Sequence, residues 1–503
     1  MIPPEVERTS ASPDPDPDAP FVFQVRDGSA IVRLEVSLDG RPLDVAKLLK
    51  REVEDGAEYA YRPEKPWADE SIHLLDVVAT DEAGNVTRET LAHFCGEPPK
   101  GPVYKIRDDG MVLKDGTPIF PIGTYGARLV PENNYDADGM FAEFASNGMN
   151  IAGSPYVYRV GDKCLYDNAR KDIFWEKAEF QLYHLSARRH GISLWFWPTT
   201  YFFPESGDPG RHEGRNDAQE CADSLRYFRD CPEVMVSYLG DDTASHATPS
   251  DVHRRNNIIH AIDPNRLTMQ ADANDYEGRY QPFAKATDVF AAEIYPFRNP
   301  EHEPNGLSQV IKDCAFAFDG LRKAGAKNRS VWTIPQAFSG DGLWHKYPSR
   351  QLLRAQTFLA VIHGCRGVIY YNYWAGPAEL SWGKTAERRA DLYSITRDLA
   401  AIANDLSSRD AARQPTVEIV EGPKTDPGQY VSVSCLLKEG EKGKGRLLLA
   451  ASSLVYGSVK AKIRIDAEKL ETLFENGRTP EFRDGVLTDS FGPGEVHVYR
   501  ARD

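Results

Sequence analysis

The feature that most constrains the fold is an alternation of strand and helix patterns that repeats eight times between residues 103 and 410. Near-continuous apolar runs are typical of parallel strands covered by helices on both faces. Eight such units in about 300 residues are the count of a (β/α)8 TIM barrel. A doubly wound open sheet is the alternative, but no glycine-rich nucleotide motif opens any helix. The apolar runs stand at 119–125, 149–156, 192–200, 234–242, 267–272, 288–297, 330–338 and 367–374.

The segments on either side of the predicted barrel have a different periodicity. Residues 21–100 and 411–503 alternate apolar and polar side chains with a period of two, which predicts antiparallel strands. We expect a β-sandwich at 21–100 and an antiparallel β-domain at 411–503, with the barrel at 101–410. Residues 1–20 are rich in Pro and Asp and are expected to be extended. The stretch "HLLDVVATDEAGN" resembles an immunoglobulin-like accessory module.

Charge and composition exclude several classes of partner. A net charge of −15 disfavours nucleic acid and anionic membranes as partners. No apolar run is long enough for a transmembrane helix. The N-terminus has no apolar signal core, so the protein is either cytoplasmic or begins after a removed signal; the module composition favours a secreted or periplasmic protein.

The cysteine pattern bears on metals and disulfides. Seven scattered Cys without a CxxC pair predict no metal cluster and no disulfide framework, and no cofactor is expected. Cys221 and Cys231 are near enough in sequence to pair, but free thiols are the preferred interpretation. The oligomeric state is left open.

Barrel enzymes build their sites at the carboxyl ends of the strands, and the residues there have two common properties. Many are aromatic, and flat rings can stack on the C–H faces of sugars. Carboxylates also converge from the fourth, fifth and sixth strands, and glycoside hydrolysis needs two of them. The candidate residues are Tyr125, Tyr156, Trp197, Asp241, Asp242, Asp272, Glu293, Tyr295, Gln336, Trp344, Tyr371 and Trp374.

Four motifs add a resemblance to a known superfamily. They are "GTPIFPIGTYG", "VSYLGDDTA", "EIYPF" and "LFENGRTP" with its following "FGPGEVHVYR". In this order they resemble the retaining glycoside hydrolases of clan A, over roughly residues 103–503. The resemblance implies a (β/α)8 barrel, a Glu acid/base after the fourth strand and a Glu nucleophile at the end of the seventh. An immunoglobulin-like module is a common companion of such barrels.

The chain departs from that pattern at both catalytic positions. Asp242 stands where the family has its acid/base Glu, and Gln336 stands where it has its nucleophile. The pair could be relocated to Asp242 and Glu293, the enzyme could invert with Asp272 or Asp275 as base, or the barrel could bind sugar without cleaving it. We favour the relocated pair, with Asp241, Tyr295, Gln336 and the aromatic residues placing the sugar.

The sequence therefore predicts a glycoside hydrolase acting on an oligo- or polysaccharide, without a metal. A separation of about 5 Å between the two carboxylates implies retention, and about 6.5–9.5 Å implies inversion. The alternatives are a non-catalytic glycan-binding barrel that has lost the strand-7 nucleophile, and a structural cell-surface protein. Asp241 is also a candidate for capping the following helix, and His190, before a strand, is interpreted as structural.

Overall fold

A computed structural model describes residues 3–502 except 128, 130–135, 154–158, 161–162, 165–177, 197–216, 246, 274–275, 298–305, 341–343, 345–346, 375–380 and 476. The chain divides into two compact units, Met1–Val103 with Trp197–Thr268 and Tyr104–Phe196 with Met269–Asp503. Among the described helices, none is long and apolar enough to cross a membrane.

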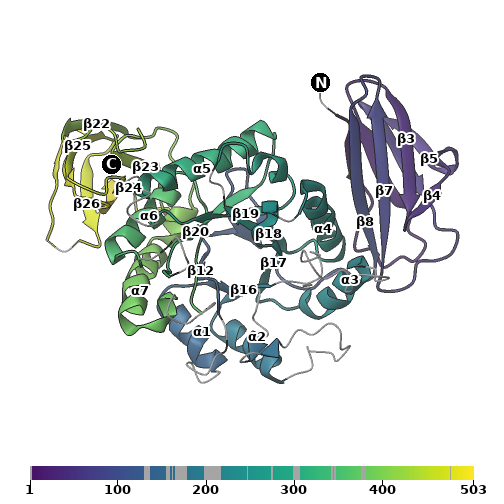
Figure 1. Ribbon diagram of the computed structural model, residues 1–503, viewed down its shortest axis with the longest axis horizontal. Coiled ribbons are helices and arrows are strands. Elements are labelled where there is room, and N and C mark those ends of the chain that lie inside the picture. Colours follow the sequence, from purple (N-terminus) through teal and green to yellow (C-terminus); the bar gives the residue numbers. More distant parts are fainter. Residues whose placement is uncertain are drawn as a thin grey trace. The chain divides into compact units, whose positions relative to one another are not determined.

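The N-terminal strands form two four-stranded antiparallel sheets, in the orders β1-β2-β6-β5 and β4-β3-β7-β8 (Figure 1). Alternation along the strands turns one face of each sheet into a shared core, where Phe23, Leu75 and Val77 are almost fully buried. The antiparallel sheets expected before the barrel are confirmed. The strands are β1 (Glu5–Arg8), β2 (Phe21–Arg26), β3 (Ile31–Leu38), β4 (Arg41–Leu43), β5 (Leu49–Val53), β6 (Gly56–Tyr61), β7 (Ser71–Asp81) and β8 (Val86–Cys95).

The same compact unit contains α3 (Asp217–Phe228), β17 (Val234–Gly240) and α4 (Pro249–Ile262). Helix α4 begins at a capping box of Thr248 and Asp251 and packs against β8. Glu89 of β8 accepts a hydrogen bond of 2.8 Å from Asn257 Nδ2 on that helix. The sandwich is therefore fastened to a helix of the barrel layer by polar contacts.

Eight parallel strands close into a barrel in the order β12-β13-β16-β17-β18-β19-β20-β21. Each strand falls within one of the eight apolar runs or one residue beyond it, so the predicted barrel is confirmed and the open-sheet alternative is wrong. The remaining barrel strands are β12 (Ile122–Thr124), β13 (Ile151–Gly153), β16 (Ser193–Phe196), β18 (Leu267–Ala273), β19 (Val289–Ile294), β20 (Ser330–Pro335) and β21 (Val368–Tyr370). A two-stranded ribbon of β14 (Arg159–Val160) and β15 (Lys163–Cys164) follows β13.

Helices follow most of the strands, and their apolar sides face the sheet. Helix α6, for example, has its N-cap at Ser349 and buries Leu353, Phe358 and Leu359. The helices of this unit are α1 (Ala137–Ser146), α2 (Ala178–Arg189), α5 (Gly306–Lys323), α6 (Arg350–Ile362), α7 (Ala386–Ala401) and α8 (Ala403–Ser407). A three-stranded antiparallel sheet precedes the first barrel strand and consists of β9 (Tyr104–Ile106), β10 (Val112–Lys114) and β11 (Thr117–Ile119).

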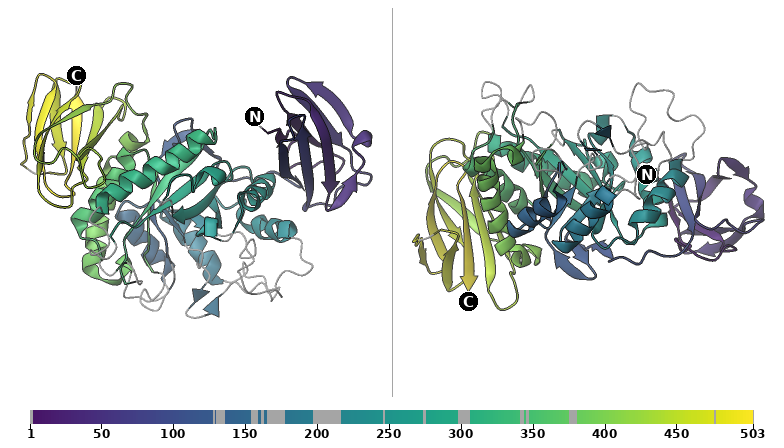
Figure 2. Two further views of the ribbon diagram at one scale, coloured as in Figure 1. Left: turned by 45° about the horizontal axis from the view of Figure 1, so that its top comes forward. Right: turned by 90° about the horizontal axis from the view of Figure 1, so that it is seen from below.

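The C-terminal residues form a second pair of four-stranded antiparallel sheets, β22-β25-β28-β27 and β23-β24-β29-β26. Strands β23 and β24 pack against helix α6, and Figure 2 shows this sandwich in yellow beside the green helices. The predicted C-terminal β-domain is confirmed. Its strands are β22 (Thr416–Glu421), β23 (Val433–Lys438), β24 (Arg446–Ser452), β25 (Val459–Arg464), β26 (Lys469–Leu473), β27 (Glu481–Arg483), β28 (Val486–Phe491) and β29 (Val496–Arg502).

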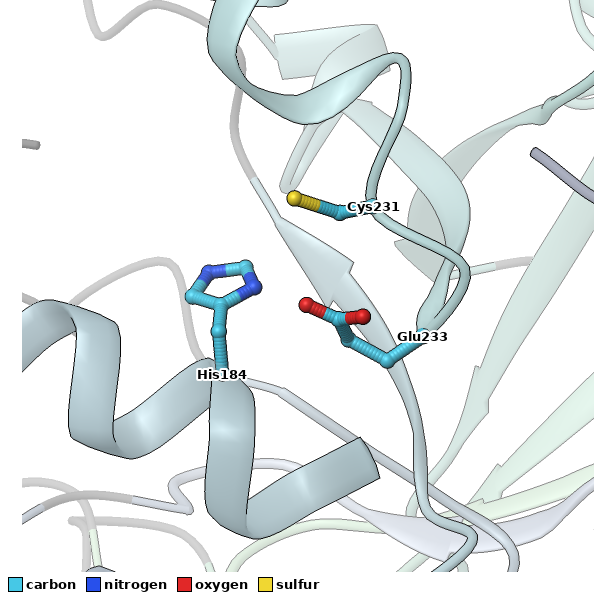
Figure 3. A group of neighbouring side chains, drawn as sticks. All are labelled: His184, Cys231 and Glu233. Atoms are coloured by element: carbon cyan, nitrogen blue, oxygen red, sulfur yellow. The ribbon is translucent and has the colours of Figure 1, made fainter. Parts of the chain in front are cut away.

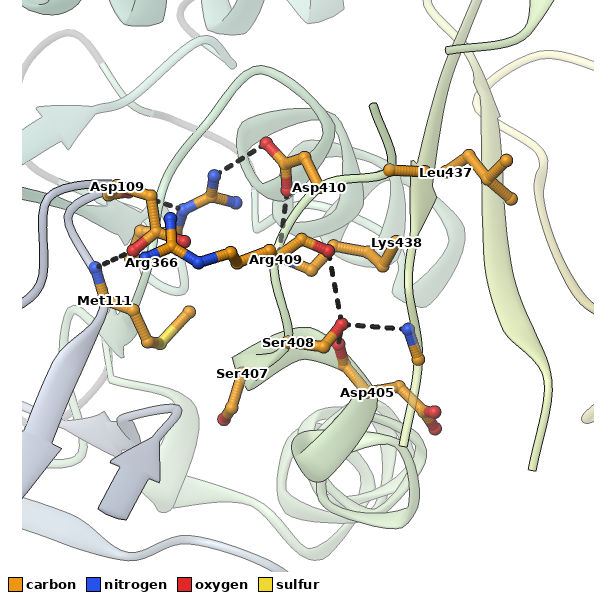
Figure 4. A network of polar contacts seen from close by, with 12 residues as sticks. Asp109, Met111, Arg366, Asp405, Ser407, Ser408, Arg409, Asp410, Leu437 and Lys438 are labelled. Atoms are coloured by element: carbon orange, nitrogen blue, oxygen red, sulfur yellow. Dashed lines mark hydrogen bonds and ion pairs between the residues drawn. The ribbon is translucent and has the colours of Figure 1, made fainter. Parts of the chain in front are cut away.

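A polar network joins this sandwich to the barrel at residues 408–411 (Figure 4). Asp410 accepts hydrogen bonds from Arg366 Nη2 at 2.7 Å and from Lys438 Nζ at 2.9 Å. Arg366 lies two residues before the last barrel strand, and Lys438 ends β23, with its side chain 1% exposed. The Asp410 carboxylate therefore binds one cationic side chain from the barrel and one from the C-terminal sandwich.

Candidate active site

Strand register decides which side chains point into the barrel. The Tyr370 hydroxyl lies 3.0 Å from Thr357 Oγ1 on α6, so Tyr370 faces the helical layer. Tyr370 pairs with Thr124 of β12, which therefore faces the same way. Because side chains alternate along a strand, the next residues, Tyr371 and Tyr125, face the barrel interior.

The same register extends from β21 through β20 to β19. Val368 lies two residues before Tyr370 and pairs with Thr333, and Thr333 pairs with Ala292. These residues therefore face the helices, and Glu293, which follows Ala292, faces the interior. The half-buried carboxylate of Glu293 thus stands inside the barrel, near the carboxyl end of β19.

Asp272 has the opposite orientation. It pairs with Ala292, which faces the helices, so its carboxylate lies on the outer side of the sheet. Arg279 Nη2 lies 2.9 Å from Asp272 Oδ1, and the Asp272 side chain is 3% exposed. This geometry favours a buried ion pair over the sugar contact that the sequence predicts for Asp272.

Aromatic rings line the interior at the same end of the barrel. The Tyr125 ring lies 4.5 Å from that of Trp195 on β16 and 5.8 Å from that of Tyr371. The Tyr371 ring in turn lies 5.9 Å from that of Tyr295, which follows β19. Tyr125 and Trp195 are buried, whereas Tyr371 and Tyr295 are half-buried, so the rings form a buried floor and a partly open rim.

Two more rings extend this cluster beyond β20. Tyr295 contacts Phe338 edge-on at 5.0 Å and Trp344 at 5.8 Å between ring centroids. Trp344 Nε1 also donates a hydrogen bond of 3.3 Å to the Tyr295 carbonyl. We call Tyr125, Trp195, Tyr295, Phe338, Trp344 and Tyr371 the aromatic bowl.

Gln336 lies under the rim of the bowl and is fully buried. Its Oε1 accepts the backbone N–H of Phe297 at 2.9 Å, and its Nε2 donates to the Phe297 carbonyl at 3.2 Å and the Phe338 carbonyl at 3.4 Å. Both amide atoms are therefore bonded to backbone, which favours a structural role for Gln336 over the sugar contact that the sequence predicts.

Trp374 lies half-buried after β21. Gly126, with φ +72°, allows the backbone to approach it closely, because a Cβ there would lie 2.8 Å from Trp374 N. Lys384 Nζ lies 5.9 Å from the centre of the indole ring. Burial raises the pKa of the neighbouring Tyr373 to about 12, so this phenol stays neutral.

Asp241 and Asp242 follow β17 in the other compact unit. The buried Tyr238 donates its hydroxyl to Asp241 Oδ1 at 2.6 Å, and Asp241 is half-buried. Asp242 is exposed, has φ +48°, and offers its carbonyl to Ser245 at the short helix Thr243–Ser245. The two neighbouring carboxylates therefore have different surroundings, one held by a hydroxyl and the other open to solvent.

Several predicted residues lie outside the described part of the chain. They include Tyr156 and Trp197 among the substrate contacts, and Asp275, the alternative base.

Side chains of the kinds that bind metal ions occur beside the barrel. Cys231 and Glu233 lie on the turn that leads into β17, and Figure 3 draws them with His184 of α2. His184 belongs to the other compact unit, and a site without metal stays a prediction. Cys221 and Cys231 are not joined by a disulfide, as expected.

Comparison with known proteins gives the fold and no family. No family model matches the chain, and no curated protein matches its sequence. A glycoside hydrolase family 5 structure from Bacteroides vulgatus ATCC 8482 shares 14% identity, with a TM-score of 0.54, over 81% of this chain and 95% of that one. An α-amylase structure from Anoxybacillus shares 10% identity, with a TM-score of 0.50, over 76% of this chain and 98% of that one. At these identities the likeness establishes a shared fold.

The sequence did not single out two members of the bowl. Phe338 carries no polar group that would have marked it as a site residue, and on the third strand Trp197 was chosen as the candidate instead of Trp195. The available signal was strand alternation, since Trp195 lies two residues before the predicted Trp197, and Phe338 two residues after Gln336.

Proposed function

We propose that this protein is a glycoside hydrolase acting on an oligo- or polysaccharide, with Glu293 as a catalytic carboxylate. The observation that carries the proposal is the register, which turns Glu293 into the barrel at the end where the aromatic bowl lies. The rings can stack on a sugar, and the carboxylate among them can supply one of the two carboxyl groups that glycosidic cleavage requires. The likeness in fold to glycoside hydrolase structures supports the same proposal.

The reaction needs a second carboxylate. One group protonates the departing glycosidic oxygen, and the other attacks the anomeric carbon or takes a proton from the attacking water. We propose Asp242 for this second role, as the sequence predicts, with Asp241 held beside it by Tyr238. The stereochemistry of the first product distinguishes retention from inversion.

A non-catalytic glycan-binding barrel is the second candidate. The sequence raised it because an amide, Gln336, stands at the position that the resemblance gives to the nucleophile. We further propose that the N-terminal sandwich is immunoglobulin-like, which its two four-stranded antiparallel sheets support. We also propose that the protein acts outside the cytoplasm, which the order of its modules supports.

A reducing-end release screen over a broad polysaccharide panel tests the proposal. Wild type, Asp242→Asn and Glu293→Gln are compared side by side. Cleavage of one glycan by wild type, with at least a 100-fold loss in both variants, is the expected result. Binding of a glycan by all three proteins without cleavage supports the binding barrel instead.

A further inference from the structure

Two glutamines form a relay of hydrogen bonds from helix α6 to the mouth of the barrel. Gln356 on α6 is buried, and its side chain donates to the Gln336 carbonyl at 2.8 Å and accepts from the Gln336 N–H at 3.3 Å. The Gln336 side chain repeats the pattern on Phe297, accepting its N–H and donating to its carbonyl. Each amide is thus hydrogen-bonded to both the N–H and the C=O of one backbone residue, and we call the pair of bonds from Gln336 to Phe297 the grip.

The grip reaches two residues that adjoin the aromatic bowl. Phe297 lies two positions after Tyr295. The third partner of Gln336 is the backbone carbonyl of Phe338, whose ring is a member of the aromatic bowl. The backbone positions of Phe297 and Phe338 therefore depend on one buried amide.

The partners also decide which side chain can stand at this position. Nε2 donates to two carbonyl oxygens, and an ionised carboxylate has no proton to offer them. A carboxylate would place its negative charge against two carbonyls in a buried site, which is costly. The position occupied by a nucleophile in related barrels is therefore chemically suited to an amide here.

We propose that Gln336 is a positioning residue, whose amide fixes the Phe297 and Phe338 backbone and thereby the rim of the aromatic bowl around the sugar. The proposal rests on the hydrolase function proposed above. It also means that Gln336 is no vestige of a lost nucleophile, and that restoring a carboxylate there will reduce activity.

The variant Gln336→Glu gives the proposal a signature of its own. When protonated, the introduced carboxyl has one O–H donor and one C=O acceptor, and so reproduces the grip on Phe297. Burial and the two carbonyls raise the pKa of such a group, so protonation falls within an accessible range. The grip is lost when the group ionises and regained as the pH is lowered.

The test measures kcat/KM and melting temperature from pH 4.5 to 8 for wild type, Gln336→Glu and Gln336→Met. At neutral pH we expect both variants to lose about 100-fold in kcat/KM. The ratio of Gln336→Glu to wild type should rise as the pH falls, whereas that of Gln336→Met stays constant. Equal or higher activity of Gln336→Glu at neutral pH, or a ratio independent of pH, overturns the proposal.

Gln414 of the C-terminal sandwich provides a matched control. Its amide makes the same kind of contacts, donating to the Ala411 and Leu437 carbonyls at 2.8 and 2.9 Å and accepting the Leu437 N–H at 2.9 Å, though it is more exposed. Gln414→Glu should lower the melting temperature without changing kcat/KM. An equal loss of kcat/KM in this control shows a general stability effect and contradicts the positioning role.

The melting temperature tests the grip independently of glycan cleavage. If wild type cleaves no glycan, the hydrolase proposal fails, but the melting temperatures of the variants still show whether the grip exists. The melting-temperature gap between wild type and Gln336→Glu then narrows as the pH falls if the grip exists. A constant gap contradicts it.

Discussion

The ammonium group of Lys438 is almost completely buried and lies 2.9 Å from the Asp410 carboxylate. Burial and the nearby Arg366 guanidinium lower the pKa of Lys438, Asp410 opposes both effects, and the net result is a pKa of about 8. The lysine is therefore largely charged at neutral pH, and it shares the Asp410 carboxylate with Arg366 (Figure 4).

Asp410→Asn should destabilise the protein by about 2–3 kcal/mol at pH 7, because it leaves two cations without their shared partner. The folded-state pKa of Lys438 lies below the 10.5 of an unperturbed lysine, so the unfolded chain binds more protons between these values. Stability therefore rises with pH in that window, and the penalty should shrink at pH 9. Urea unfolding at both pH values measures it; an equal penalty at both contradicts the account of Lys438.

Helix α6 meets the C-terminal sandwich through a half-buried histidine. His363 caps the helix, and its Nε2 lies 3.0 Å from Ser434 Oγ on β23. Burial lowers the pKa of His363 from 6.5 to about 4. The unfolded chain therefore takes up a proton at a pH where the folded chain does not.

Because burial lowers the pKa of His363, the protein should be most stable with respect to this group above about pH 6.5 and should lose about 2 kcal/mol as the pH falls toward 4. His363→Gln removes the titrating group while keeping a polar side chain. Its free energy of unfolding should change less between pH 7 and 5 than that of wild type. Parallel pH dependence in the two proteins would show that another group is responsible.

The first barrel strand and the segment after the last meet at Gly126. Gly126→Ala would place a Cβ 2.8 Å from Trp374 N, in a left-handed backbone conformation that alanine disfavours. We expect a loss of at least 2 kcal/mol and a shift in Trp374 fluorescence. Gly116→Ala, also at positive φ but with open space around its Cβ, is the control and should leave the fluorescence unchanged. Unchanged fluorescence in Gly126→Ala would contradict the close approach.

At the scale of the molecule, the C-terminal sandwich is an integral part of its compact unit. Besides the contacts of α6, Arg500 of β29 makes a two-pronged ion pair with the buried Asp405 of α8, at 2.6 and 2.8 Å. Ending the chain at residue 410 would expose the apolar surface of α6 and leave Asp405 without this partner. The truncated protein should therefore be insoluble or bind a hydrophobic dye, as measured by fluorescence. A soluble, cooperatively unfolding truncation would show that the sandwich is dispensable.

Much of this architecture was predictable, because it follows from local periodicity. The eight apolar runs gave the barrel, and the period-two segments gave the antiparallel sheets. The site was harder to predict, because the side of the sheet to which a side chain points depends on the register between strands that are far apart in sequence. Glu293 and Asp272 look equivalent as carboxylates near strand ends, and only pairing with Ala292 and Thr333 shows that they point to opposite sides of the sheet. The bonds of Gln336 to Phe297 were likewise invisible, since they join two separate loops.

The most direct measurement of the central claim compares these two carboxylates on a glycan that wild type cleaves. Glu293→Gln should reduce kcat/KM by about 10³-fold or more, without a large change in melting temperature, because the interior carboxylate acts on the sugar. Asp272→Asn should lower the melting temperature, because it breaks the pair with Arg279, and keep kcat/KM within about tenfold of wild type. Near-normal turnover by Glu293→Gln, or loss in Asp272→Asn alone, would contradict the claim that the interior-facing Glu293 carries the chemistry.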